Sequence, residues 1–342
     1  MNIINILLSD KNGGVEQSFV NYCIMLQQND CKILAIIKQN AEFIPDLQKN
    51  NINFIEVKNK FGYHDIFSIL RIRKIIKNFK TNRVIAHAGR SIIIAKKALN
   101  FLKIPLIAVN HSNNIKRSLK ADIIFAVNNN IINKIQQTSS HKNYHLIPNS
   151  IAIDKKIEAK ELTISKRKTI TLGSMGRLAQ EKNFDGLITI IKFLKDQNYK
   201  IKLKIAGTGQ EENNLKNLVK NLNLEKNIEF LGWVDQKTFF EQIDIFILLS
   251  KEETFGMVFL EASKYQKLII ASNTDGATML LKHQENAIII DQNKNISQQI
   301  INNLQFLQKN PELISTIIKN SYQNLCDNYS NKVIRKKILN IT

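Results

Sequence analysis

A stretch of nine residues in the second half of the sequence carries two glutamates around a glycine. Glu253-Thr254-Phe255-Gly256-Met257-Val258-Phe259-Leu260-Glu261 follows a short apolar run and leads into a helical pattern. Gly256 lets the backbone come close to a ligand, and the amides after it stand at a helix N-terminus, which favours anions. We expect Glu253 in the loop and Glu261 about one turn into the helix, at the carboxyl edge of a sheet, where α/β proteins bind ligands. The alternative is two unrelated glutamates on a solvated helix.

A second group of residues supplies positive charge. Arg177 ends the segment Gly173-Ser174-Met175-Gly176-Arg177, which leaves a predicted strand, and Lys182 follows five residues later. Arginine offers phosphate a bidentate fork and lysine offers it a point charge. The sequence contains no Asp-x-Asp, the motif that would hold Mg²⁺ or Mn²⁺ on a diphosphate. We therefore expect these two cations to balance the charge of a diphosphate; the alternative is two exposed cations in a lysine-rich chain.

Several familiar signatures are missing or weak. The sequence has no GxxxxGK[ST], GxGxxG, GxSxG or HExxH. Gly207-Thr208-Gly209, taken alone, predicts only a tight turn between a strand and a helix. His141 and His145 have the spacing of helical metal ligands but no third ligand nearby, so we expect a solvated pair. Three scattered cysteines exclude a disulfide scaffold and a zinc ribbon.

Short apolar runs alternate with helical patterns along the whole chain, which indicates parallel α/β sheets. Two series of about six strands are too many for one sheet of typical size, so we expect two sheets in two domains. The predicted strands of the first half are Ile3–Leu8, Lys32–Ile37, Asn53–Val57, Arg83–His87, Leu106–Val109, Ile123–Val127 and His145–Ile147. Those of the second half are Thr169–Gly173, Lys202–Ala206, Ile228–Leu231, Ile245–Leu249, Leu268–Ala271 and Ala287–Ile290.

The domain boundary is expected after Pro148-Asn149-Ser150, where an aperiodic, charged linker runs from Ile151 to Lys168. We place the first domain at residues 1–155 and the second at residues 156–324. After Asp291 only a helical pattern remains, from Ser297 to Ile341.

The chain of 342 residues has a formal net charge of +20, and the excess is uneven. Residues 1–160 contain 24 basic and 10 acidic residues, whereas residues 161–342 contain 25 and 19. The first domain is therefore expected to face an anionic partner: nucleic acid, a membrane surface or a phosphorylated substrate. Neither a signal peptide nor an apolar run long enough to span a bilayer is present in the sequence, so we expect a cytoplasmic, reduced protein.

Much of this basic excess lies in two segments with helical pattern. Between His64 and Arg83, basic residues are interleaved with Ile66, Ile69, Ile72, Ile76 and Phe79; the basic residues are Arg71, Arg73, Lys74, Lys77, Lys80 and Arg83. The segment Ser91–Lys103 adds Lys96, Lys97 and Lys103. One interpretation is two helices that pack by their apolar stripe and hold their lysines in water. The other is a surface attracted to anionic lipid, at about 1 kcal/mol per basic residue.

Together, these motifs resemble the family-4 retaining glycosyltransferases of the GT-B fold. The resemblance covers nearly the whole chain and is strongest from Thr169 to Ala271. Its motifs are Gly13-Gly14-Val15-Glu16 for GGxE, Ile147-Pro148-Asn149-Ser150 for IPNG, Gly176-Arg177-Leu178 with Lys182 for GRL-x3-K, Gly207-Thr208-Gly209, Phe230-Leu231-Gly232, and Glu253 to Glu261 for E-x7-E. It implies two Rossmann-like domains facing across a cleft, the first binding the acceptor and the second the nucleotide sugar. A C-terminal helix at about 325–342 is expected to pack back onto the first domain.

The resemblance also implies roles for individual residues. Arg177 and Lys182 hold the donor diphosphate, assisted by amides of Gly14 and of residues 256–258. Glu261 binds the ribose and Glu253 the donor sugar, while the backbone from Phe230 to Val234 follows the base. The implied donor site comprises Gly14, Arg177, Lys182, Gly207, Gly209, Trp233, Val234, Glu253, Phe255, Gly256, Met257, Val258 and Glu261. The implied catalytic residues are Glu253, His111, Arg177 and Lys182.

Three further residues, Glu16, His87 and Arg90, are expected on the acceptor side. His111, taken alone, is as compatible with a satisfied core histidine as with a place at the reaction centre. The family's chemistry is transfer with retention at the anomeric carbon, without metal or other cofactor, and electrostatic stabilisation of the leaving diphosphate would be the main contribution of the protein. The chain departs from the family at Gln266-Lys267-Leu268, where Gly-x-Pro is usual, and at Met279, where a glutamate is usual.

The sequence therefore predicts a glycosyltransferase that uses a UDP- or GDP-linked sugar. The expected acceptor is a glycan or lipid-linked molecule of bacterial surface polysaccharide or lipopolysaccharide synthesis, and the expected location is the inner face of the plasma membrane. A nucleotide-sugar epimerase of the same fold is one alternative. A basic nucleic-acid-binding protein is another, although no aromatic-rich stacking segment or known nucleic-acid motif occurs.

Overall fold

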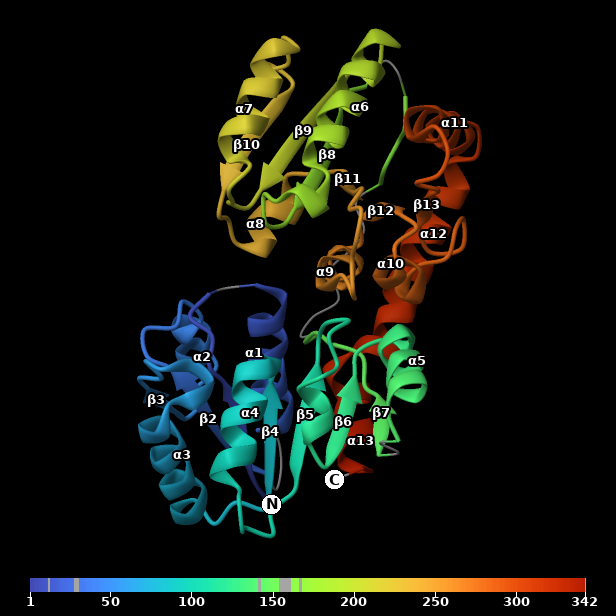
Figure 1. Ribbon diagram of the computed structural model, residues 1–342. Coiled ribbons are helices and arrows are strands. Elements are labelled where there is room, and N and C mark those ends of the chain that lie inside the picture. The colour runs from blue at the N-terminus through green and yellow to red at the C-terminus, as the bar shows by residue number, and fades with distance from the viewer. Residues whose placement is uncertain (12, 28–30, 141–142, 154–160, 166–167, 342) are drawn as a thin grey trace. The chain divides into compact units, whose positions relative to one another are not determined.

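The computed structural model describes residues 1–11, 13–27, 31–140, 143–153, 161–165 and 168–341. The chain divides into two compact units (Figure 1). The first comprises Met1–Ala152 together with Tyr329–Thr342, and the second comprises Ile153–Asn328. Residues 154–160 and 166–167 of the predicted linker lie outside the described residues, as does His141 of the predicted histidine pair.

Seven parallel strands form the sheet of the first unit, in the order β3-β2-β1-β4-β5-β6-β7. The central strands are largely apolar and buried because helices cover both faces of the sheet, whereas the edge strands β3 and β7 are mostly half-buried. The strands are β1 Asn2–Leu7, β2 Lys32–Lys38, β3 Phe54–Val57, β4 Arg83–His87, β5 Leu106–Asn110, β6 Ile123–Ala126 and β7 Tyr144–Leu146.

The helices of this unit are α1 Gly14–Leu26, α2 Ile44–Lys49, α3 Ile66–Asn78, α4 Ala88–Ala98, α5 Asn129–Thr138 and α13 Asn331–Leu339. Two of them begin at side-chain caps: Asp65 accepts from the Ser68 amide at α3, and Asn128 accepts from the Ile131 amide at α5. Alternating residues of the strands divide the core between the two faces. Ile4, Ile6 and Leu8 pack in a cluster with α3 and α4, whereas Leu7 packs in the cluster of α1 and α2.

Six parallel strands form the sheet of the second unit, in the order β10-β9-β8-β11-β12-β13. The strands are β8 Ile170–Met175, β9 Ile201–Ala206, β10 Ile228–Gly232, β11 Ile245–Leu248, β12 Leu268–Ser272 and β13 Ile288–Ile290. The helices are α6 Phe184–Asp196, α7 Glu212–Asn221, α8 Gln236–Glu241, α9 Met257–Lys264, α10 Asp275–Leu280, α11 Ile296–Lys309 and α12 Pro311–Asn324.

The core of the second unit also has two faces. Ile245, Ile247 and Leu249 join a cluster with residues of α6, α7, α11 and α12. Phe246 points to the other face, where its ring meets Phe240 of α8 and Phe259 of α9. The two parallel sheets confirm the predicted fold class, and each predicted strand has a counterpart; the last strand of the first unit begins one residue earlier than predicted, at Tyr144.

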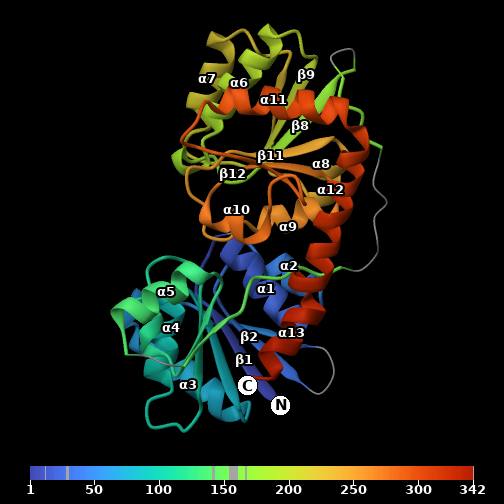
Figure 2. The same ribbon diagram turned by 90° about the vertical axis from the view of Figure 1, so that its right-hand side faces the viewer.

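The chain crosses between the units at residues 152/153 and again at 328/329. Near these crossings Ile151 forms two backbone hydrogen bonds. Its amide donates to Tyr329 O at 3.1 Å, and its carbonyl accepts from the Asn331 amide at 3.0 Å. A π-helical turn, Leu325–Tyr329, leads into α13. Figure 2 shows α13 beside α1, with Ile334 and Ile338 fully buried.

The packing of α3 differs from the prediction at one residue. Ile72 and Ile76 are buried and Ile69 is half-buried, as the apolar stripe requires. Ile66 was expected in this stripe but is 66% exposed. It is the first residue of the helix, and at 3.6 residues per turn it lies about 80° around the helix from the buried Ile76.

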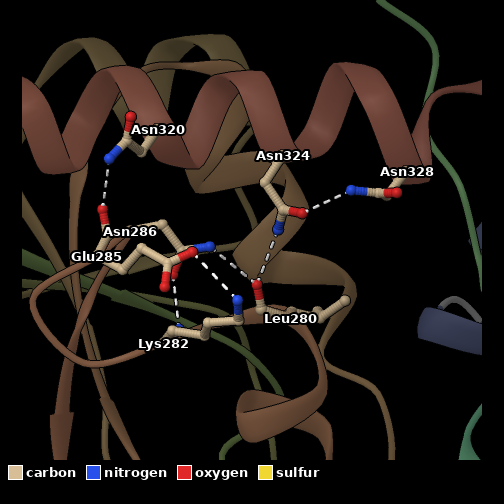
Figure 3. Close-up of polar contacts among 7 residues, drawn as sticks. All are labelled: Leu280, Lys282, Glu285, Asn286, Asn320, Asn324 and Asn328. Carbon is tan, nitrogen blue, oxygen red and sulfur yellow. Dashed lines mark hydrogen bonds and ion pairs between the residues drawn. The ribbon is translucent and has the colours of Figure 1, made fainter.

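A row of asparagines on α12 holds the segment that follows α10 (Figure 3). Asn324 donates to the carbonyl of Leu280 at 2.9 Å, and Asn320 donates to the carbonyl of Glu285 at 2.9 Å. Asn328 donates to the side chain of Asn324 at 2.9 Å. Asn286 completes the network, because its side chain donates to Leu280 O and accepts from the Lys282 amide. The end of α10 is thereby anchored to α12.

Candidate functional site

Strand order places one candidate site in each sheet. In the second unit, β8 pairs with β9 on one side and with β11 on the other, so the loops after β8 and β11 leave the sheet in opposite directions. Such a switch point is where open α/β sheets bind ligands. Arg177 and Lys182 follow β8, and Glu253 follows β11. The residues singled out in the sequence therefore lie at the switch point.

Two glycine-containing loops pack tightly beside these residues. Gly207 has a φ of +123°, and a Cβ there would lie 2.0 Å from the carbonyl oxygen of Gly176. Backbone hydrogen bonds join the same loops, from Leu178 N to Thr208 O at 2.9 Å and from Gly207 N to Gly232 O at 2.7 Å. Only glycine fits such an approach, so the Gly-Thr-Gly segment is more than a generic turn. It fixes the loop that carries Arg177.

Lys182 and Glu253 form an ion pair across the switch point. The ammonium Nζ contacts Glu253 Oε2, and the two side chains are only 18% and 15% exposed. Lys182 lies in a short 3₁₀ turn, Gln180–Lys182, which is tied to the next loop by the Lys251 amide donating to Glu181 O at 2.8 Å. Arg177 differs, because its side chain is 70% exposed and pairs with Glu181. Lysine and glutamate are thus preorganised, while the arginine lies in solvent.

The loop that contains Glu253 is held by a backbone hydrogen bond from α10. The Gly276 amide donates to Glu253 O at 2.7 Å, and a side chain at Gly276 would collide with the backbone of Phe255. Gly256 caps α9 with a φ of +82°, and Glu261 is 4% exposed one turn into that helix. Phe255, Gly256 and Met257 are buried, whereas Glu253 and Thr254 before them are half-buried. The row of asparagines on α12 therefore supports this loop through α10.

The remaining predicted donor residues lie at the ends of β9 and β10. Gly209 packs on Leu178, since a Cβ at Gly209 would lie 2.2 Å from the Leu178 carbonyl oxygen. Trp233 follows β10 and is 75% exposed, and Val234 beside it is half-buried. An exposed indole at the carboxyl edge of a sheet offers an aromatic face to a flat ligand.

The switch point of the first unit lies between β1 and β4. The segment after β1 is tied to α4, because the Leu8 amide donates to Ser91 Oγ at 2.9 Å and Arg90 donates to Leu8 O at 3.3 Å. Gly14 is the first residue of α1, and a Cβ there would meet nothing within 4 Å. Glu16, in the first turn of α1, is 8% exposed.

Two histidines meet at the carboxyl ends of β4 and β5. His87 Nδ1 and His111 Nε2 are 3.0 Å apart, and the rings are nearly parallel, with 19° between their planes. Burial, reinforced by the neighbouring His111, lowers the pKa of His87 well below its usual value. Burial lowers the pKa of His111 to about 4. Both rings are therefore neutral at pH 7.

The prediction placed His87 among residues that line the acceptor, but its side chain is fully buried. The rings of Phe19 and Tyr22 of α1 pack on it edge-on, with centroids 5.6 and 4.8 Å away. His111 is half-buried, so of the two histidines only His111 is accessible to solvent. Arg90 is also half-buried. The periodicity of β4 already placed His87 at the end of a buried strand, which was the signal for a core position.

Sequence reasoning also missed several residues that position the site. Glu181 pairs with Arg177, and Gly276 holds the loop of Glu253. Ala88, directly after His87, adopts a φ of +61°. Spacing within a motif could have suggested Glu181 as the i+4 partner of Arg177. The other two depend on contacts between loops that are distant in the sequence.

Comparison with known proteins agrees with this geometry. The family model described as "Glycosyl transferases group 1" matches residues 154–324, half of the chain. The chain belongs to the group 1 glycosyl transferases. It is 29% identical over 319 residues to an uncharacterized glycosyltransferase of Haemophilus influenzae, with 88% of each chain covered. It is 22% identical over 289 residues to the lipopolysaccharide core biosynthesis glycosyltransferase LpsE of Rhizobium meliloti, with 82% of each covered.

Solved structures show the fold of this glycosyl transferase. The crystal structure of Anabaena Alr3699/HepE in complex with UDP and glucose has a TM-score of 0.83 and 18% sequence identity, and the match covers 99% of this chain and 98% of that one. The fold is GT-B, as predicted. No helix in the described part of the chain is long and apolar enough to cross a membrane. In that same part, no three His, Cys, Asp or Glu side chains gather as a set of metal ligands.

Proposed function

We propose that this glycosyl transferase is a family-4 enzyme that moves a sugar from a nucleotide-diphosphate donor to a glycan or glycolipid acceptor, with retention at the anomeric carbon. The observation that carries the proposal is the Lys182–Glu253 ion pair at the switch point of the second unit. A cation and a hydroxyl-binding carboxylate in direct contact match two groups that are adjacent in such a donor, the diphosphate and the sugar. The UDP and glucose in the Anabaena structure support this class of donor.

Each donor residue has a defined task. Lys182 neutralises the β-phosphate, and the exposed fork of Arg177 closes on it when the donor binds. The amides after Gly256 add a helix N-terminus. Glu261 binds the ribose hydroxyls and Glu253 the hydroxyls of the sugar, while Trp233 and Val234 lie along the base. Gly207 and Gly209 keep the supporting loops close together.

The chemical step is the departure of the diphosphate. Negative charge grows on its β-phosphate as the bond to the anomeric carbon breaks, so fixed cations stabilise the transition state more than the ground state. The leaving diphosphate accepts the proton of the acceptor hydroxyl. Glu253 holds the sugar while positive charge develops at its anomeric carbon. His111 is proposed as the catalytic residue of the first unit. No metal has a step in this scheme, because Lys182 and Arg177 supply the charge.

Donor hydrolysis tests this proposal. Purified protein is incubated with UDP- and GDP-linked hexoses, with or without excess EDTA, and release of the nucleoside diphosphate is measured. We expect one donor to be hydrolysed slowly, at the same rate in EDTA, with the sugar released in its original anomeric configuration. Activity that EDTA abolishes and Mn²⁺ restores, or release of the inverted sugar, would contradict the proposed mechanism.

The same assay separates transfer from the alternatives. An epimerase would convert the donor sugar without needing an acceptor, so it would yield an epimer in place of a transferred product. A nucleic-acid-binding protein would release no nucleoside diphosphate. Because relatives act in lipopolysaccharide core synthesis, lipopolysaccharide core oligosaccharides are the first acceptors to try.

The first unit is proposed to bind the acceptor and to attach peripherally to the inner face of the plasma membrane. The outward face of α3 combines apolar and basic side chains. Ile66, Phe67 and Leu70 are 66%, 77% and 59% exposed, and Phe61 just before the helix is 67% exposed. Arg71, Lys74, Lys77 and Lys80 continue the exposed face, and α3 contains no acidic residue.

This distribution suits an anionic bilayer better than nucleic acid. The bulky apolar side chains would enter the headgroup region, and the basic residues would face lipid phosphates, which contribute about 1 kcal/mol each. Nucleic acid would attract the basic residues but leave Phe67 and Leu70 in water. Such a surface brings a lipid-linked acceptor to the sheet edge of the first unit.

Vesicle sedimentation tests the surface. Replacing Arg71, Lys74, Lys77 and Lys80 by Glu, or Phe67 and Leu70 by Ser, should release the protein from vesicles containing anionic phosphatidylglycerol. A matched control reverses four exposed lysines of the second unit, Lys220, Lys226, Lys309 and Lys319, and should retain binding. If both charge-reversed proteins bind equally, or if DNA at the same salt competes with the vesicles, the assignment is wrong.

A further inference from the structure

His87 has an environment that a satisfied core residue does not require. It is the last residue of β4, and it is followed by Ala88 in the left-handed region, with a φ of +61°. An alanine in this conformation costs about 1 kcal/mol or more and persists only where the surrounding structure imposes it. The turn could form at lower cost with glycine. The backbone is thus held in a strained path at the point where it directs the His87 ring.

The strained turn aims His87 at a single polar partner. Its Nδ1 lies 3.0 Å from Nε2 of His111, and the small angle of 19° between the ring planes suits a hydrogen bond in the plane of both rings. His111 lies just beyond the end of β5, the neighbour of β4 in the sheet. With Nε2 occupied, Nδ1 is the only ring nitrogen that His111 can offer to a ligand.

The surroundings of His87 also indicate where the proton lies. Its Nε2 is buried and has no hydrogen-bond partner among the described residues, and the neighbouring rings are Phe19 and Tyr22. An unpaired N–H is rarer in protein interiors than an acceptor left without a donor. The proton of the neutral ring therefore belongs on Nδ1, where it meets His111.

We infer that His87 is a positioning residue: its Nδ1–H donates to His111 Nε2, which orients the His111 ring and leaves the His111 proton on Nδ1. His111 then presents an N–H donor, not a basic lone pair, to an oxygen of a bound substrate. The consequence for the reaction rests on the proposed role of His111, whereas the hydrogen bond and the tautomer do not. The two parts can therefore be tested separately.

NMR spectroscopy tests the tautomer without any substrate. The chain has six histidines, so selective ¹⁵N labelling gives few ring signals. At pH 7 we expect the His111 ring to carry its proton on Nδ1, with its Nε2 signal shifted by the hydrogen bond. In His87→Leu the His111 signals should change to those of two exchanging tautomers. A proton on Nε2 of His111 in the wild-type protein would overturn the proposal.

Kinetics test the consequence. The amide nitrogen of Asn is placed much like Nδ1 of His, so His87→Asn keeps the donor, whereas His87→Leu removes it. We expect His87→Leu to lower kcat about tenfold or more with donor KM little changed, because ring orientation is lost, and His87→Asn to restore most of the rate. His145→Asn, on the exposed end of the same sheet, is the matched control. Circular dichroism and the melting temperature show whether each variant is folded.

The outcomes separate the two claims. Equal loss of kcat in the Leu and Asn variants, with both folded, would reduce His87 to a packing residue and overturn its positioning role. If His111→Ala retains wild-type kcat while the NMR result holds, His87 still orients His111, and it is the catalytic role of His111 within the proposed function that fails.

Discussion

The switch points of the two sheets have the same topology but bring together side chains of different chemistry. In the second unit, the loops after β8 and β11 bring together two charges, and Lys182 and Glu253 neutralise each other in a largely buried ion pair. In the first unit, the ends of β4 and β5 bring together two imidazoles that burial keeps uncharged. The first pair therefore consists of two full charges, whereas the second consists of neutral hydrogen-bonding groups.

This difference explains why only one site is easy to detect in the sequence. A diphosphate site requires glycines that let the backbone come close, a helix N-terminus and cations. These requirements fix particular residue types at particular spacings in the sequence. A neutral site needs only an occasional polar side chain at the end of a strand. The acidic and basic residues of the second unit form motifs, while His87 and His111 are separated by a helix and a strand.

The largest effect is expected from breaking the charged pair. Lys182→Ala and Glu253→Gln should each lower kcat about 100-fold, because growing charge on the leaving group and at the anomeric carbon loses its stabilisation. Steady-state kinetics with the identified donor measure this. Lys192→Ala, which removes an exposed ion pair with Asp196 on α6, is the control and should not change kcat. Wild-type kcat in Glu253→Gln would show that the reaction centre is misplaced.

The neutral pair should appear in the pH dependence of stability. An unfolded histidine has a pKa near 6.5, whereas the pKa of native His111 is about 4 and that of His87 is also lowered. Between these values the unfolded chain binds more protons than the native chain. The contribution of the two histidines to the free energy of unfolding is therefore fully present above pH 6.5 and decreases as the pH falls below it. The slope is up to about 1.4 kcal/mol per pH unit for each histidine.

Urea unfolding at pH 7.5, 6.5, 5.5 and 4.5 measures this slope. The double variant His87→Leu/His111→Leu should show a shallower decline than the wild-type protein over the same range. Comparison of the two proteins removes the contribution of carboxylates, which they share. Parallel curves would mean that neither histidine is held neutral by burial.

A smaller effect is expected from Glu261. Its proposed partner, the ribose, does not change during transfer, so its hydrogen bond is about equally strong in the ground and transition states. Glu261→Gln should raise donor KM about tenfold, as expected for a lost charge-assisted hydrogen bond of about 1.5 kcal/mol, and leave kcat nearly unchanged. A large decrease in kcat with constant KM would place Glu261 at the reacting atoms instead.

The smallest effect tests the strain beside His87. Ala88→Gly should raise the free energy of unfolding by about 0.5–1 kcal/mol, because glycine adopts a φ of +61° without strain. Ala98→Gly, in the last turn of the same helix, should instead lower it by about 1 kcal/mol. Equal destabilisation by both changes, measured in urea, would show that the turn at Ala88 stores no strain.

The fold was largely predictable because its strands are buried on both faces. Runs such as Ile245–Leu248 contain no polar residue, and this continuity indicates a parallel sheet without knowledge of any contact. The motif from Glu253 to Glu261 was placed correctly for the same reason, since a buried strand, a glycine and a helix occur in direct succession.

Contacts between distant loops were not predictable. The partner of Lys182 is 71 residues away, and the motif that contains Glu253 does not show that the two side chains are in contact. His87 was expected to line the acceptor because the family resemblance implied it, yet its side chain is fully buried and α1 covers it with Phe19 and Tyr22. Ile66 lies outside the packed stripe because it is about 80° around the helix from Ile76.

The return of α13 to the first unit has a consequence for the order of synthesis. Its buried residues Ile334 and Ile338 leave the ribosome only after all of the second unit has been made. At about 5–20 residues per second, residues 153–328 take on the order of ten seconds or more to translate. During that interval the surface of α1 that α13 will cover stays open, and α13 is held in place only once the backbone of Ile151 can bond to Tyr329 and Asn331. The first unit therefore lacks its last helix throughout the synthesis of the second unit. The second unit can complete its fold before the first one does.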